Sequence, residues 1–220
     1  MMKSTTYNFG RLATRYDDWY STSAGRRHDR AQKSVVLALL PAPAKGSRPR
    51  LLDAGCGTGH WSMFFAQRGF DVTGVDLSPA MIAMARARHA PHCRFITANL
   101  LNLPFPDGTF DVACIITALE FTTDATRACA EMWRCLKPGG RLLVGTLNRL
   151  AALNRKRRAA VKGPFAKARL FDQESLRSLL ATCGDAVIRV TQENQSGRTA
   201  PSGARAHANG AMLVAKVDKP

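Results

Sequence analysis

Three glycines, each one residue apart, follow an aspartate in the segment D-A-G-C-G-T-G at residues 53–59. The segment comes directly after an apolar run and directly before a helical pattern. Glycine adopts backbone conformations that other residues avoid, and it lets a ligand approach the main chain closely. The N–H groups at the start of the following helix favour an anionic group. This combination is typical of a nucleotide or nucleoside site.

Two common nucleotide motifs do not fit this loop. The dinucleotide motif G-x-G-x-x-G needs its third glycine at position 60, which is His60 here. No Gly-Lys-Ser/Thr follows, so the loop is not a P-loop either. Asp76 ends the next predicted strand, where a carboxylate can bind the two hydroxyls of a ribose. The residues therefore favour a nucleoside that is bound without a pyrophosphate.

Strand and helix patterns alternate around this loop. Strand patterns occupy 50–55, 71–77, 93–99, 110–117 and 141–147, and helical patterns lie between most of them. Such alternation predicts βαβ units with right-handed crossovers. Two later strands, at 186–192 and 210–217, predict an antiparallel pair. We therefore expect an α/β fold with a doubly wound, mostly parallel, seven-stranded Rossmann-like sheet and an antiparallel C-terminal edge hairpin.

These motifs together resemble the class I methyltransferases that depend on S-adenosylmethionine (SAM), and in particular their UbiE-like, type 11 group. The loop with Asp76 resembles the SAM site of that family. Residues 99–113 are similar to the segment that carries the adenine contact, and 131–144 to the helix, turn and strand that follow. The match covers residues 50–148, and 16–30 is similar to an N-terminal segment that folds over the cofactor in some members.

The resemblance implies roles for the loop residues. Asp53 orders the turn, and Gly55, Cys56, Gly57 and Gly59 belong to the part of the loop that lies beside the cofactor.

It also implies roles at the neighbouring strand ends. Asp76 binds the ribose hydroxyls and Leu77 flanks adenine. Asn99 stands where the family usually has an aspartate that bonds the adenine amino group, and Leu100 offers its N–H to the ring. At the methionine end, Thr117 closes the fourth strand beneath the sulfonium, and Tyr16 covers that end.

Glu120 follows the fourth strand and is the one weak candidate for a catalytic residue. It either faces the acceptor as a base or caps the next helix. A base is needed only if the acceptor is protonated and weakly acidic. The histidines and cysteines have no metal-binding spacing, so we expect no metal site.

The net charge of +16 comes from the two ends of the chain. Residues 1–50 carry +7, 51–148 are neutral and 149–220 carry +9.

We expect one methyltransferase domain over 1–220, with an N-terminal helical cap (1–49), a cofactor-binding core (50–148), and a substrate-side insert with the C-terminal strands (149–220). The basic ends favour an anionic small-molecule acceptor. An RNA methyltransferase and a non-catalytic subunit of the same fold are the alternatives.

Other features predict the location. No apolar run approaches the roughly 18–20 residues that span a bilayer, and the N-terminus lacks a secretory pattern. Six cysteines without a C-x-x-C pair are compatible with reduced thiols. We therefore expect a cytoplasmic protein without a transmembrane segment. The sequence carries no signal of oligomeric state.

Overall fold

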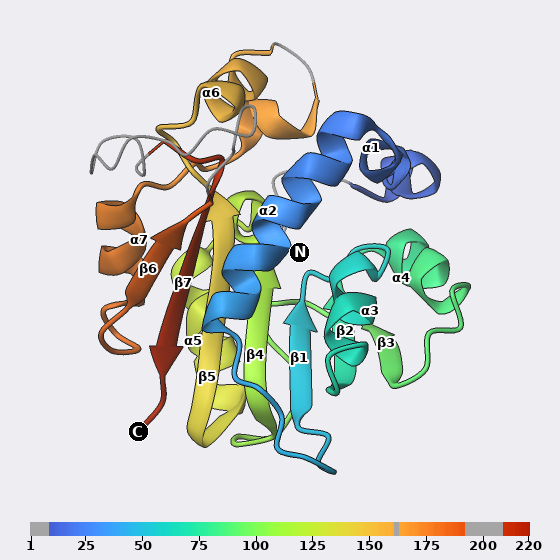
Figure 1. Cartoon of the computed structure of the whole chain (residues 1–220), viewed down its shortest axis with the longest axis vertical. Helices are drawn as coiled ribbons and strands as arrows, with labels where there is room; N and C mark the ends of the chain where they lie inside the picture. The colour runs from blue at the N-terminus through green and yellow to red at the C-terminus, as the bar shows by residue number, and fades with distance from the viewer. Residues whose placement is uncertain (1–8, 161–162, 192–208) are drawn as a thin grey trace.

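The computed structural model describes residues 9–160, 163–191 and 209–220. One seven-stranded sheet runs through it in the order β3-β2-β1-β4-β5-β7-β6 (Figure 1). The strands are β1 (Arg50–Ala54), β2 (Asp71–Asp76), β3 (Cys93–Thr97), β4 (Phe110–Ile116), β5 (Leu136–Leu147), β6 (Val187–Val190) and β7 (Met212–Asp218). The first five strands are parallel, and β7 is antiparallel to both β5 and β6. The predicted fold class is confirmed, with β7 lying between β5 and β6.

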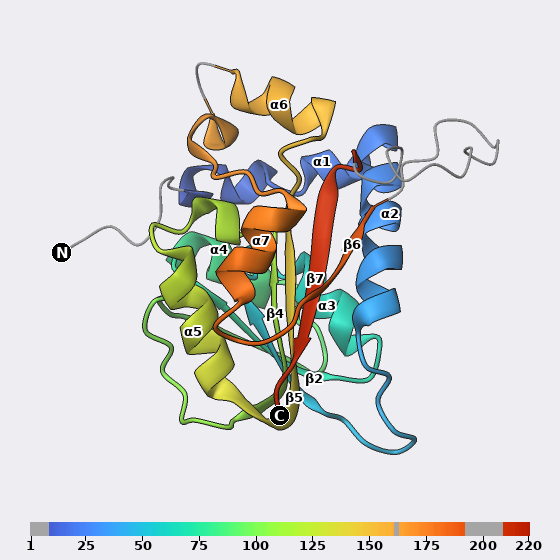
Figure 2. The same cartoon turned by 90° about the vertical axis from the view of Figure 1, so that its left-hand side faces the viewer.

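Helices cover both faces of the sheet. They are α1 (Asp18–Ser21), α2 (Ser23–Leu39), α3 (His60–Ala66), α4 (Pro79–Arg86), α5 (Ala125–Cys135), α6 (Ala152–Arg158) and α7 (Gln173–Leu180), with short 3-10 turns η1 (Phe9–Arg15), η2 (Leu119–Phe121) and η3 (Pro164–Lys167). In Figure 2, α2 and α3 lie on one face, and α5 and α7 lie on the other. Their apolar side chains form the two largest buried clusters with the strands between them.

The apolar run at 34–40 is the end of a longer helix. That helix is α2, which begins at Ser23. The Thr22 side chain caps its start by accepting a hydrogen bond from the Gly25 N–H at 2.9 Å. Val36 and Leu39 then bury the last turns against the sheet. The last turns of α2 are therefore packed on the sheet.

The Lys-Pro-Gly-Gly segment lies inside β5. Leu136 pairs with Phe110 and Arg141 pairs with Val112, so residues 137–140 bulge out between two registers. Gly139 has a left-handed φ of +73°, which a turn here requires. The predicted turn is present, and strand pairing begins before it as well as after it.

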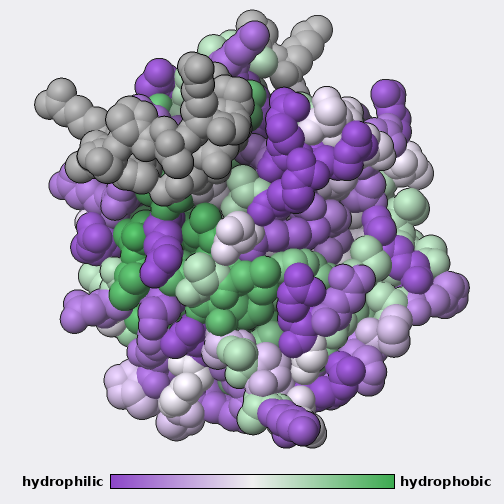
Figure 3. All heavy atoms as spheres, viewed as in Figure 1, coloured by the Kyte–Doolittle hydropathy of each residue, from purple (hydrophilic) through white to green (hydrophobic). Residues whose placement is uncertain are grey.

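The face that α2 covers has a mixed surface. Figure 3 shows an apolar area in the part of this view where α2, β6 and β7 lie, bordered by hydrophilic side chains. Its exposed apolar residues include Leu37 on α2 and Val187 on β6. No helix in the described ranges is long and apolar enough to cross a bilayer.

Candidate cofactor site

The glycine loop joins β1 to α3 and is fixed to the end of β2. The N–H groups of Gly55 and Cys56 both donate to the carbonyl oxygen of Val75, at 2.7 and 2.9 Å. All three loop glycines have a positive φ, of +75°, +53° and +84° along the chain. The loop therefore has a defined left-handed path, which explains why glycine occupies these positions.

Two of the glycines have different surroundings. A Cβ atom on Gly55 would lie 2.4 Å from the Cβ of Ala118, so this residue must be small for β1 and the end of β4 to meet. A Cβ atom on Gly57 would have Tyr16 Cε1 as its nearest neighbour, at 4.0 Å. The protein's own packing thus explains Gly55, whereas Gly57 leaves space beside the main chain.

Asp76 lies at the end of β2, next to that space. Its Oδ2 accepts a hydrogen bond from the Gly57 N–H at 3.0 Å, and its Oδ1 accepts one from the Ser78 N–H at 2.8 Å. Burial raises the pKa of Asp76, and these backbone donors oppose the shift. A carboxylate has about four acceptor sites, so both oxygens can still accept hydroxyl groups. The loop therefore orients Asp76 without using up its acceptors.

Asp53 ties β1 to the helix after the loop. It is fully buried, and its Oδ2 accepts a hydrogen bond from Ser62 Oγ on α3 at 2.6 Å. Burial raises the pKa of Asp53 to about 7. Its contact is therefore with the helix that follows the glycines, and Ser62 is a residue that the sequence analysis did not single out.

Asn99 and Leu100 follow β3. Asn99 Oδ1 accepts a hydrogen bond from the Leu101 N–H at 2.9 Å, which makes a local turn. The Leu100 N–H has no acceptor among the described residues. Leu77, at the end of β2, is exposed. The turn thus leaves a backbone donor open, as the predicted adenine contact requires.

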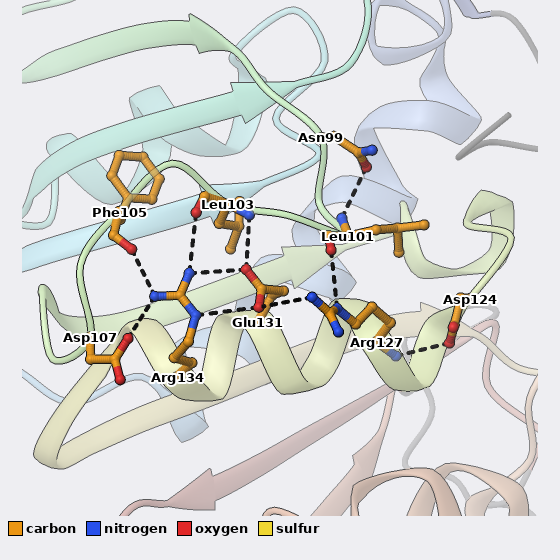
Figure 4. Close-up of polar contacts among 9 residues, drawn as sticks. All are labelled: Asn99, Leu101, Leu103, Phe105, Asp107, Asp124, Arg127, Glu131 and Arg134. Carbon is orange, nitrogen blue, oxygen red and sulfur yellow. Dashed lines mark hydrogen bonds and ion pairs between the residues drawn. The ribbon is translucent and has the colours of Figure 1, made fainter. Parts of the chain in front are cut away.

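Three side chains of α5 fix this turn (Figure 4). The Leu103 N–H donates to Glu131 at 2.9 Å. Arg134 donates to the carbonyl oxygens of Phe105 and Leu103, at 2.8 and 3.1 Å, and to Asp107 and Glu131. Arg127 donates to the Leu101 carbonyl oxygen at 3.1 Å. This α5 clamp (Arg127, Glu131 and Arg134) holds residues 101–107 in place.

The end of β4 carries Thr117 and then Glu120. Thr117 has φ +51°, which is unusual for a β-branched residue, and its N–H donates to Gly145 at 2.7 Å. Such outliers concentrate at functional sites. Glu120 does not cap the next helix, because Asp124 caps α5 by accepting from the Arg127 N–H. Its side chain instead points to β5.

The N-terminal segment contacts the glycine loop through polar groups. Asp17 accepts a hydrogen bond from Thr58 Oγ1 at 2.9 Å and pairs with Arg88. Tyr20 stacks on the His60 ring at 3.9 Å. Tyr16 is half-buried, and burial raises its pKa to about 12, with smaller contributions from Asp76, Asp17 and Glu120.

The sequence pattern pointed to Tyr16 but not to its neighbours Asp17 and Thr58, because nothing local pairs residues so far apart. His60, taken from the sequence mainly as the residue that breaks a motif, also bonds Asp29 at 2.7 Å. No group of three His, Cys, Asp or Glu in the described ranges is placed to hold a metal.

Residues 52–144 match the family model described as "Methyltransferase domain". A malonyl-[acyl-carrier protein] O-methyltransferase of Pectobacterium atrosepticum is 37% identical over 139 residues, which are 63% of this chain and 51% of that protein. A demethylmenaquinone methyltransferase of Thermus thermophilus is 38% identical over 144 residues, 62% of each chain.

A solved structure agrees over almost the whole chain. It is a SAM-dependent methyltransferase, possible histamine N-methyltransferase, of Thermotoga maritima, with a TM-score of 0.74 and 26% identity over 96% of this chain and 98% of that one. The match to the methyltransferase family thus covers residues 52–144, and the likeness in fold to a SAM-dependent methyltransferase extends over 96% of the chain. The chain spans 51% and 62% of the length of the two curated relatives named above.

The observed geometry of this domain fits SAM. Space is left beside Gly57, Asp76 lies next to it with acceptor sites to spare, and the Leu100 N–H is open. A nucleoside needs these three features: room against the backbone, an acceptor pair for the ribose, and a donor for the base.

Proposed function

We propose that this domain binds SAM and transfers its methyl group to a small-molecule acceptor. The observation that carries the proposal is the hydrogen bond from the Gly57 N–H to Asp76 Oδ2, which orients a half-buried carboxylate beside a glycine that has room for a further atom. SAM supplies a methyl group that its sulfonium already makes electrophilic. The protein's task is then to hold both reactants in line and to exclude water.

Each site residue has a proposed part in binding. Asp76 accepts the ribose hydroxyls, while Leu77 and Leu100 flank the adenine ring and the Leu100 N–H donates to it. Asn99 accepts a hydrogen bond from the adenine amino group through the remaining lone pair of its side-chain oxygen. Its free amide N–H₂ can donate to the same ligand. Thr117 and Tyr16 border the methionine end.

We also propose that the acceptor is anionic. Residues 149–171 contain eight Lys or Arg and no Asp or Glu. Arg157 is held between the rings of Trp19 and Phe165, at 4.9 and 5.1 Å, which ties α6 to α1 and η3. The positive potential of such a segment attracts anionic molecules. The malonyl group named for one relative is an acceptor of this kind.

Calorimetric titration with SAM and with S-adenosylhomocysteine tests the proposal. The wild-type protein should bind both, and Asp76→Ala should weaken binding at least about 100-fold, because two hydrogen bonds to a charged group are lost. Asp71→Ala is the matched control. Asp71 is exposed at the opposite end of β2, so its removal should leave the affinity unchanged.

Two results would contradict the proposal. One is an absence of binding by the wild-type protein at about 1 mM of either ligand. The other is an equal effect of the two aspartate substitutions.

A further inference from the structure

Glu120 has a buried carboxylate oxygen without a partner. The residue lies in η2, directly after β4, and its side chain is fully buried. Its Oε1 accepts hydrogen bonds from Thr146 Oγ1 at 2.9 Å and from the Leu147 N–H, both on β5. Its Oε2 has no hydrogen-bond partner among the described residues. A buried acceptor without a donor is costly, so it needs an explanation.

Phe121, the next residue along the chain after Glu120, is buried in a small apolar cluster with Leu147, Ala168 and Leu170. The Phe121 ring packs against Phe9 at 4.7 Å and against Phe165 at 6.0 Å between ring centroids. The backbone oxygen of Glu120 accepts a hydrogen bond from the Arg169 N–H at 2.9 Å. Burial raises the pKa of the Glu120 carboxyl to about 7. The two hydrogen bonds to Oε1 thus fix the orientation of the Glu120 side chain, and Oε2 remains available to accept a hydrogen bond.

Asp76 ends β2 and Glu120 follows β4, and β1 with its glycine loop lies between these two strands in the sheet. Ala118, two residues earlier, packs against Gly55, whereas Asp76 bonds to Gly57. The pKa of Tyr16 responds to both Asp76 and Glu120, so the phenol lies within electrostatic range of the two carboxylates. With the ribose on Asp76, as the proposed function has it, the opposite end of the cofactor is directed toward Glu120.

We propose that Glu120 is the acceptor-binding residue of the methyl-transfer end, and that Oε2 receives the hydrogen bond of an acceptor O–H or N–H group. This inference rests on the proposed function. As the acceptor oxygen or nitrogen takes the methyl group, its bond to hydrogen breaks and the proton passes to Oε2. The electron pair of the sulfur–methyl bond stays on sulfur. The rings of Phe9 and Phe165, which pack on the neighbouring Phe121, then contact the body of the acceptor.

A pair of cofactor analogues tests this without any acceptor. Sinefungin carries an ammonium group in place of the methylsulfonium of SAM, so it offers N–H donors at the methyl-transfer end. S-adenosylhomocysteine offers none there. The wild-type protein should prefer sinefungin, and Glu120→Gln should lower that preference roughly 10-fold, because a charge-assisted hydrogen bond becomes a neutral one.

Glu131→Gln is the control. Glu131 is also buried, but it bonds to Leu103 and Arg134 in the α5 clamp. Its substitution should change the affinities for both ligands by the same factor. An unchanged sinefungin preference in Glu120→Gln would overturn the inference, and so would an equal loss of preference in the two variants.

The wild-type protein provides a readout that needs no variant. Because burial raises the pKa of Glu120 to about 7, the preference of the wild-type protein for sinefungin should rise between pH 6 and pH 8, as the carboxyl loses its proton. A flat preference would overturn the inference even if Glu120→Gln failed to fold. If the wild-type protein binds neither analogue, it is the proposed function that fails. If it binds both with a flat preference, only the role of Glu120 is lost.

Discussion

At the scale of single residues, the glycine loop combines two requirements that look identical in the sequence. Gly55 is small because Ala118 would collide with a Cβ atom at 2.4 Å, whereas a Cβ atom on Gly57 would only touch Tyr16, at 4.0 Å. The spacing of the glycines predicted a nucleoside loop. It could not show which glycine is required by the packing of the protein and which is not, because Ala118 is remote in sequence.

Gly55→Ala should destabilise the fold more than Gly139→Ala. Both positions have a similar left-handed φ, +75° and +73°, so both substitutions carry a backbone cost of about 1 kcal/mol. Nothing lies within 4 Å of a Cβ atom on Gly139. Gly55→Ala adds the collision with Ala118, which overpacks the core by about 1–3 kcal/mol.

Urea unfolding of the two variants measures that difference directly. The account expects Gly55→Ala to unfold at a clearly lower urea concentration and to bind S-adenosylhomocysteine more weakly. Equal urea midpoints of unfolding for the two variants would show that the contact of Ala118 with Gly55 does not limit the size of the residue at position 55.

At the scale of elements, the clamp on α5 decides where the turn after β3 lies. Glu131 and Arg134 bond the main chain of residues 103 and 105, and Asn99 closes the turn just before them. The helical spacing of this segment predicted α5. The clamp itself depends on pairs that are 26 to 31 residues apart, so it was outside the reach of pattern analysis.

Arg134→Met should loosen this turn and destabilise the protein by about 2–3 kcal/mol. It removes hydrogen bonds to two carbonyl oxygens and to Asp107, and it leaves the buried Glu131 without that charged partner. The Arg134 side chain is 30% exposed, which keeps the effect below that of a fully buried pair.

Hydrogen exchange of the Leu101 and Leu103 amides, together with urea unfolding, checks this prediction. Arg177→Met, on the exposed side of α7, is the control and should change neither. If exchange at Leu103 stays as slow in Arg134→Met as in the wild-type protein, the clamp does not hold the turn.

At the scale of the whole molecule, the sequence predicted the parallel core of the sheet but not the contacts of the N-terminal segment with the glycine loop. Alternating strands and helices predicted the sheet, and Asp76 predicted the ribose side of the site. The contacts of Asp17 with Thr58 and of Tyr20 with His60 join the N-terminal segment to the loop. No local pattern encodes them, because they depend on how α2 packs across the sheet.

The distribution of charge also has meaning only at this scale. The basic residues of 149–171 follow the last parallel strand, and α6 lies beyond the ends of β4 and β5 in Figures 1 and 2. The backbone N–H of Arg169 donates to the carbonyl oxygen of Glu120, so the main chain of this basic segment adjoins the proposed acceptor-binding residue. A methyl acceptor with an anionic group and a reactive O–H or N–H group would suit both the basic segment and Glu120.

A crystal structure of the protein with S-adenosylhomocysteine tests the central claim most directly. The account predicts both ribose hydroxyls within hydrogen-bonding distance of Asp76, the adenine ring between Leu77 and Leu100, and the sulfur on the Glu120 side of the glycine loop. A nucleoside bound elsewhere, or a ribose that does not touch Asp76, would contradict it.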